Sequence, residues 1–167
     1  MIEQPIATSL EALNAMVESE NTVAEFYLLC SERFTVHHRF WAALAREELA
    51  HAQVIRRLIE LVSIQPSEFA IGKSAPVDAI QSFIRRTQSS IETLKQADLP
   101  EDKALLMAYQ IENTFIELQY GNVVTTENAD YKALLGQVIS DTLRHKERVV
   151  TRMGKLRKGA KLPKKSS

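Results

Sequence analysis

Cysteine is almost absent from this chain, since Cys30 is the only one among 167 residues. A single thiol excludes a disulfide framework, a zinc ribbon and a four-thiolate iron site within one chain. No apolar run approaches membrane-spanning length, and the N-terminus, which carries Glu3, lacks the basic and apolar stretches of a signal peptide. These absences predict a cytoplasmic protein with no membrane partner.

The chain has no net charge either, because 21 lysines and arginines balance 21 aspartates and glutamates. A neutral chain has no global field to attract nucleic acid, so we expect no nucleic-acid partner. After Glu147 there are no acidic residues, and the basic ones cluster at Lys155, Arg157, Lys158, Lys161, Lys164 and Lys165. This stretch lacks interleaved aromatic residues for stacking on bases. We predict one helical domain over residues 1–154 and a disordered basic tail over 155–167, with binding to an anionic partner as the alternative.

Glycine and proline are scarce, with five of each, and half of these ten residues fall at three junctions, at residues 66–76, at Pro100 and at Gly121. Between the junctions, apolar side chains recur at steps of three and four residues, the pattern of amphipathic helices. The sequence predicts five helices, over residues 8–34, 36–62, 76–97, 101–126 and 129–153. No segment shows the period of two that is typical of a strand, so we predict an all-α protein.

The lengths of these helices and connections predict how they pack. Helices of about 25 residues are roughly 38 Å long, and four such rods pack best side by side at shallow angles. Short junctions near residues 35 and 127 predict two antiparallel hairpins, joined by a long connection over residues 64–99. We therefore expect an antiparallel four-helix bundle of two hairpins joined by a long crossover that contains an extra helix. The apolar face of that helix must cover either the bundle or a second subunit.

Ionisable residues interrupt the apolar stripes of four helices, at Glu20, Glu48, His51, Glu112 and His145. A buried carboxylate costs several kcal/mol without a compensating charge, and no lysine or arginine shares these stripes. Glu48 and His51 stand at i and i+3, so their side chains converge on one point. Alone, each residue is more often a boundary glutamate or a hydrogen-bonded core histidine. Together they favour a divalent metal site, since carboxylate and imidazole suit iron, manganese or zinc.

Three motifs resemble the rubrerythrin branch of the ferritin-like superfamily, over residues 8–153. They are Glu20 followed by Tyr27, the segment Glu47-Glu48-Leu49-Ala50-His51-Ala52, and Glu112 followed by Tyr120. The resemblance implies a di-iron carboxylate site in which Glu20 is the first-helix ligand, Glu112 is a terminal ligand, Glu48 bridges two metals and His51 binds one. It also implies a homodimer. Tyr27 and Tyr120 would donate hydrogen bonds to the ligands or act as one-electron relays, with packing as core aromatic residues as the alternative.

The sequence departs from the family pattern at two site positions. The family has Glu-x-x-His on its last helix, but Thr142 precedes His145 here, and Asp141 is the nearby carboxylate that could swing in as a ligand. Peroxide-reducing rubrerythrins carry a further carboxylate where this chain has Phe115. The family's rubredoxin domain is missing as well, so a redox-active protein would need an external electron donor protein.

Two functions follow from these residues. The first is a metal-binding protein with a di-iron-type site that handles oxygen, peroxide or iron. The alternative is a helical interaction protein whose site is degenerate and holds one metal or none, as Thr142 and Phe115 suggest.

Overall fold

A computed structural model describes residues 4–72, 77–118 and 123–160 of the chain. This part is predominantly helical, which confirms the all-α prediction, and it contains α1 (Gln4–Arg33), α2 (His38–Ile64), α3 (Val77–Gln96), α4 (Glu101–Glu117) and α5 (Ala129–Ala160). Two 3-10 turns, η1 (Thr35–His37) and η2 (Pro66–Glu68), and two short strands, β1 (Phe69–Ile71) and β2 (Val124–Thr126), lie in the connections. None of the described helices is both long and apolar enough to cross a membrane.

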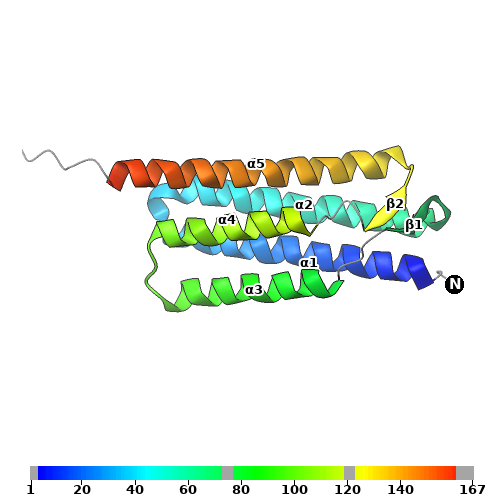
Figure 1. Ribbon diagram of the computed structural model, residues 1–167, viewed down its shortest axis with the longest axis horizontal. Coiled ribbons are helices and arrows are strands. Elements are labelled where there is room, and N and C mark those ends of the chain that lie inside the picture. The colour runs from blue at the N-terminus through cyan, green and yellow to red at the C-terminus, as the bar shows by residue number, and fades with distance from the viewer. Residues whose placement is uncertain (1–3, 73–76, 119–122, 161–167) are drawn as a thin grey trace, which may run out of the picture.

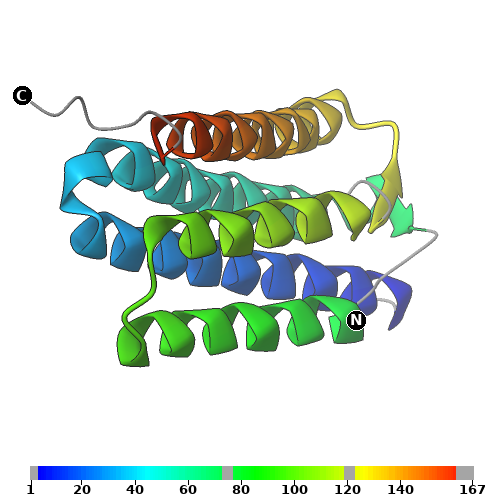
Figure 2. The ribbon, with the colours of Figure 1, turned by 60° about the vertical axis from the view of Figure 1, so that its left-hand side comes forward.

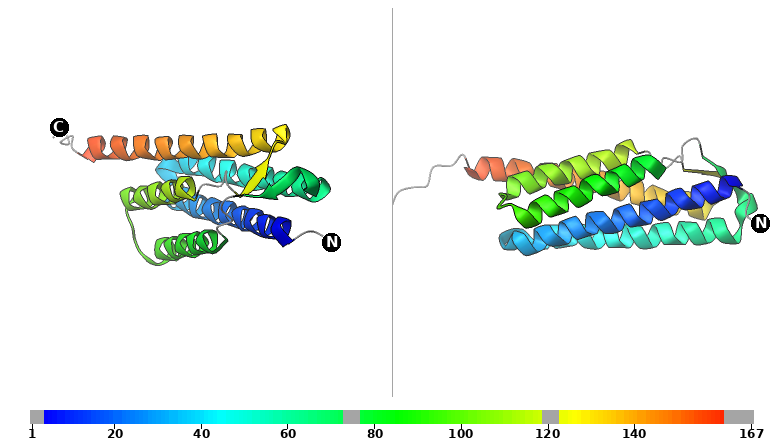
Figure 3. Two further views of the ribbon diagram at one scale, coloured as in Figure 1. Left: turned by 45° about the vertical axis from the view of Figure 1, so that its right-hand side comes forward. Right: turned by 90° about the horizontal axis from the view of Figure 1, so that it is seen from below.

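The helices lie side by side along one long axis (Figure 1). Helices α1 and α2 form an antiparallel hairpin through η1, and α4 and α5 form a second one. Helix α2 packs against α5, which brings the two hairpins together. The crossover between them includes β1 and then α3, which runs back along α1 to the start of α4 (Figures 1 and 2). Seen from below, α3 lies beside both α1 and α4 (Figure 3).

Helix α3 covers the side of the bundle within one chain. Its buried residues recur at helical spacing, at Ile80, Phe83, Ile84, Thr87, Ile91 and Leu94. The ring of Phe83 packs against that of Phe115 on α4, with 4.7 Å between centroids. A second subunit is therefore not needed to cover this face, and the expected homodimer loses that support.

Two helix boundaries differ from the prediction. Helix α4 ends at Glu117, and β2 occupies part of the region predicted as helix up to residue 126. The cause is local, because residues 123–126 are all β-branched and favour an extended chain. Helix α5 continues to Ala160, so residues 155–160 of the predicted tail are helical, while residues 161–167 lie outside the described part. Arg157 and Lys158 suit the last turn because cations stabilise the negative end of the helix dipole.

Strands β1 and β2 tie the two long connections together at one end of the bundle. They pair antiparallel, with Phe69 opposite Thr126 and Ile71 opposite Val124. The hydroxyl of Ser9 on α1 donates to the carbonyl oxygen of Val123 at 3.2 Å. This end of the molecule is thus held by backbone pairing as well as by the core.

Candidate metal centre

Five of the six predicted site residues lie in the core, where four helices meet, and the sixth, Asp141, is partly exposed. Helix α1 contributes Glu20, α2 contributes Glu48 and His51, α4 contributes Glu112, and α5 contributes His145. Each is at most 2% exposed. Each also stands on the apolar face of its helix, so the packing that buries the stripe buries the ionisable side chain too. The inward orientation predicted from the sequence is confirmed.

Glu48 is the centre of the cluster because each of its oxygens meets one histidine. Oε2 lies 3.0 Å from Nδ1 of His51, and Oε1 lies 2.8 Å from Nδ1 of His145. The two imidazole rings stack with 5.3 Å between centroids and 22° between planes. Ligand atoms of these three residues lie within 4.8 Å of one another. This buried group could hold a divalent metal ion.

Glu20 and Glu112 each lie close to one histidine of the cluster. Oε2 of Glu20 lies 3.7 Å from Nδ1 of His51, and Oε1 of Glu112 lies 3.8 Å from Nδ1 of His145. Within the described part of the chain, both oxygens of Glu20 lack a hydrogen-bond partner, and so does Oε2 of Glu112. Buried carboxylate oxygens are costly in that state, so a cation would suit this donor set.

The pKa values of these groups follow from burial and from the crowding of carboxylates around two imidazoles. Burial and the neighbouring Glu48 carboxylate raise the pKa of Glu20 well above its usual range, and they raise the pKa of Glu112 to about 8. Burial would raise the pKa of Glu48 too, but hydrogen bonds with His145 and His51 outweigh it and leave the pKa well below its usual range.

The pKa values of both histidines are raised, although burial alone would lower them. Burial favours the neutral imidazole of His51, but the nearby Glu20 and Glu48 carboxylates raise its pKa to about 11. The pKa of His145 is also raised, because Glu48 outweighs burial there. Protonated imidazoles therefore balance the Glu48 charge in the metal-free protein, and a bound metal ion would have to displace those protons.

The outer nitrogens of both histidines face a second pair of carboxylates. Nε2 of His51 lies 3.4 Å from Oδ2 of Asp141, and Nε2 of His145 lies 2.8 Å from Oε2 of Glu47. Asp141 pairs in turn with Arg144. Carboxylates in this position fix the orientation of an imidazole.

Asp141 therefore differs from the expected substitute ligand, because it lies on the side of His51 opposite the Nδ1 atom that faces Glu48. The sequence prediction missed Glu47 as a site residue. The signal was present in the pair Glu47-Glu48, but the contact with His145 depends on how α2 and α5 pack. Arg148 holds the same Glu47 carboxylate, with Nη1 2.8 Å from each oxygen.

The two departures from the family pattern contribute no ligand atom. The hydroxyl of Thr142 donates to the carbonyl oxygen of Val138 at 3.0 Å, and Phe115 packs in the core against α3. Tyr27 is fully buried and donates a short hydrogen bond to Oε1 of Glu112. Tyr120 lies outside the described residues.

Comparison with protein-family models, with curated proteins and with solved structures gives no match for this chain.

Proposed function

We propose that the chain is a ferritin-like, rubrerythrin-type protein that binds a divalent transition metal in its core and acts in oxygen, peroxide or iron handling. The observation that carries the proposal is the pair of buried carboxylates beside the Glu48–His51–His145 cluster, because both oxygens of Glu20 and Oε2 of Glu112 lack hydrogen-bond partners. Uncompensated burial of two carboxylates is unfavourable, and a cation removes that cost.

The arrangement favours two cations over one. Glu20 lies beside His51, and Glu112 lies beside His145. Glu20 and His51 would hold one ion, Glu112 and His145 would hold the other, and the Glu48 carboxylate lies beside both histidines. Three carboxylates neutralise most of the charge of two divalent ions. Iron fits a donor set of carboxylate oxygen and imidazole nitrogen, with manganese and zinc as the competing ions.

Bound iron would supply one-electron chemistry towards dioxygen or peroxide. The residues of the chain would bind and orient it. Asp141 and Glu47 hold the imidazole rings of His51 and His145 from outside. The lone thiol, Cys30, is buried, and burial raises its pKa, so it does not replace a thiolate redox domain. Electrons would come from an external donor protein, and the protein is proposed to work as a homodimer.

The test is metal binding measured together with thermal stability. After anaerobic loading with Fe²⁺ and removal of free metal, we expect about two ions per chain and a higher melting temperature. A ligand at one hundred times its dissociation constant stabilises the folded state by about 2.7 kcal/mol. Glu48→Gln should abolish both effects, because it removes the charge of the carboxylate that lies beside both histidines. Glu25→Gln, on the exposed face of α1, is the matched control and should keep them.

The second candidate is a metal-free or mono-metal helical interaction protein, and Thr142 and Phe115 favour it because neither supplies a ligand. If the melting temperature does not change when Fe²⁺, Mn²⁺ or Zn²⁺ is added, and less than one ion is bound per chain, the metal-free form is established. One ion per chain would support the mono-metal form.

A further inference from the structure

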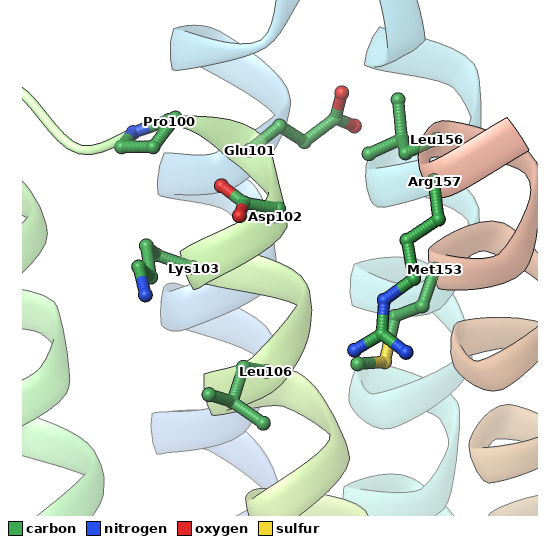
Figure 4. A pocket seen from close by; sticks show the side chains of 8 residues that line it. All are labelled: Pro100, Glu101, Asp102, Lys103, Leu106, Met153, Leu156 and Arg157. Carbon is green, nitrogen blue, oxygen red and sulfur yellow. The ribbon is translucent and has the colours of Figure 1, made fainter. Parts of the chain in front are cut away.

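Two grooves open beside the C-terminal half of α5, and each has a volume of about 420 Å³. The first lies between α5 and the start of α4, and its lining combines apolar side chains such as Leu106 with charged ones such as Asp102 and Arg157 (Figure 4). The second lies between α5 and the start of α2, where Phe40 belongs to its lining. The described lining of the first groove has two acidic and two basic residues, whereas cations outnumber acidic residues four to one in the second.

The four cations of the second groove all belong to α5, and they are Arg144, Arg148, Arg152 and Lys155. They follow one another at steps of four, four and three residues, so they share one face of the helix. Like charges at these steps destabilise a helix. Glu147 is the one acidic residue of the described lining. An anion bound in the groove would offset this repulsion.

Two of these cations already have a carboxylate partner. Arg144 pairs with Asp141. Nη1 of Arg148 lies 2.8 Å from each oxygen of Glu47. A guanidinium group carries five N–H donors, so Arg148 keeps donors that Glu47 does not occupy. These ion pairs hold two arginine side chains in place, but they leave the charge of the other two cations unbalanced.

Arg152 and Lys155 lack such a partner among the described residues, where neither forms an ion pair or a hydrogen bond. Nε of Arg152 is buried and has no acceptor within this part of the chain. The guanidinium carbon of Arg152 lies 5.9 Å from the centre of the Phe40 ring, a cation–π contact that favours one orientation of the group. A cation that is already held in place loses less conformational entropy when it binds a ligand.

We propose that the second groove binds an anion with two linked phosphate groups, of which inorganic pyrophosphate is the simplest. The forked donors of a guanidinium match the oxygens of a phosphate group, and Lys155 adds a point charge beside them. Arg144 and Lys155 are eleven residues apart, about 16 Å along α5, so a diphosphate reaches more of the cations than a single phosphate does. The volume of the groove lies in the range of small-molecule sites. This site is separate from the metal centre, and binding there does not require bound metal.

A purely structural role for these cations makes a different prediction. The aliphatic part of an arginine or lysine covers apolar surface while its charged end stays in water, and this would also place Arg152 over Phe40. Such side chains attract anions through the overall charge of the surface, and salt screens that attraction. A specific site would instead depend on the individual cations of the groove when the ionic strength is held constant.

Calorimetric titration of pyrophosphate into the metal-free protein, at an ionic strength kept constant with sodium chloride, separates the two cases. We expect saturable binding to the wild type. In Arg152→Gln and in Lys155→Gln the affinity should fall by about tenfold, because each variant loses a charged hydrogen-bond donor. Glu147→Gln should bind more tightly, since it removes the acidic residue of the lining. Arg157→Gln is the control and should match the wild type, because Arg157 carries the same charge on the same helix but lines the first groove (Figure 4).

Titrations with ADP and with inorganic phosphate identify the source of the phosphate groups. Tighter binding of ADP than of pyrophosphate would support a nucleoside diphosphate as the ligand, and the opposite order would support a free diphosphate. Inorganic phosphate that binds as tightly as pyrophosphate would contradict a site for two linked groups.

Two outcomes would overturn the site: no binding of pyrophosphate or ADP, or an affinity that falls as much in Arg157→Gln as in Arg152→Gln. A second measurement uses the wild type alone, so it decides even if a variant does not fold. Phenylglyoxal modifies arginine side chains, and pyrophosphate should protect Arg152 from it more than Arg157 in a peptide map; equal protection would contradict the site. Because these measurements use metal-free protein, failure to bind iron would refute the proposed function and leave the pyrophosphate result standing.

Discussion

Glu112 allows the charge balance of the core to be tested through the pH dependence of stability. Its carboxyl is fully buried beside Glu48, and its pKa is raised from 4.5 to about 8. The folded metal-free protein therefore keeps this group protonated at pH values where the unfolded chain has released the proton. The contribution of Glu112 to stability is complete below pH 4.5, falls as the pH rises, and is lost by about pH 8.

The magnitude follows from that interval. At about 1.36 kcal/mol for each pH unit, the folded state should lose roughly 4 kcal/mol between about pH 5 and about pH 8 through Glu112 alone. Glu112→Gln removes the titrating group but keeps an oxygen that can accept the hydrogen bond from Tyr27. When metal has been removed with a chelator, the free energy of unfolding of the variant relative to the wild type should therefore rise by about that amount between the lower and the higher pH.

Urea unfolding of both proteins at the two pH values measures this difference. His51 also loses its stabilising contribution as the pH rises, between the ordinary histidine value of 6.5 and about 11, and it does so in both proteins. Glu112 interacts with His51 and His145, so the measured difference includes the change that Glu112→Gln makes to the pKa values of these histidines. Glu32→Gln, on an exposed position of α1, is the control and should follow the wild type. If the gap between wild type and Glu112→Gln is the same at both pH values, Glu112 is ionised in the folded metal-free core and our reasoning about its burial is wrong.

Two further predictions concern the support of the site and of the bundle. Asp141→Asn and Glu47→Gln should each weaken metal affinity by about 10–100-fold in calorimetric titrations, because each removes a carboxylate that orients a histidine ligand. Glu60→Gln on the surface is the control and should leave the affinity unchanged. Affinities equal to that of the wild type would show that neither carboxylate orients its histidine. Phe83→Ala should cost about 3–5 kcal/mol in urea unfolding, because the ring anchors α3 against α4; Val36→Ala, at a position that is 87% exposed, should cost less than about 0.5 kcal/mol, and an equal cost would mean that α3 does not pack as described.

The faces of the helices could be predicted from the sequence, because helical periodicity is a local property. Glu20, Glu48 and Glu112 were assigned to the core from the apolar residues three and four positions away, and all three are buried. The same reasoning placed His51 and His145, and it predicted that α3 is amphipathic. Local spacing says which side of a helix a residue occupies, and the core lies on the apolar side.

Contacts between helices could not be predicted in this way. Glu47 stands beside Glu48 in the sequence but about 100° around the helix, and only the packing of α2 on α5 brings it to His145. Asp141 meets the outer nitrogen of His51 for the same reason. The end of α4 was also missed, because β2 gains stability from its pairing with β1, more than fifty residues earlier in the chain.

The pairing of β1 with β2 has a mechanical consequence for the centre. Glu20, Glu48 and His51 belong to one hairpin, and Glu112 and His145 belong to the other. Their axial offset therefore changes whenever one hairpin slides along the other, by about 1.5 Å for each residue of displacement. Helix packing alone resists such sliding weakly, because neighbouring grooves offer similar fits. A strand pair does not slide gradually, since a shift of one residue would reverse the face of every side chain in the pair. The three paired positions from Phe69 to Ile71 therefore fix the position of one hairpin along the other, and with it the axial offset between Glu48 and its partners on the second hairpin.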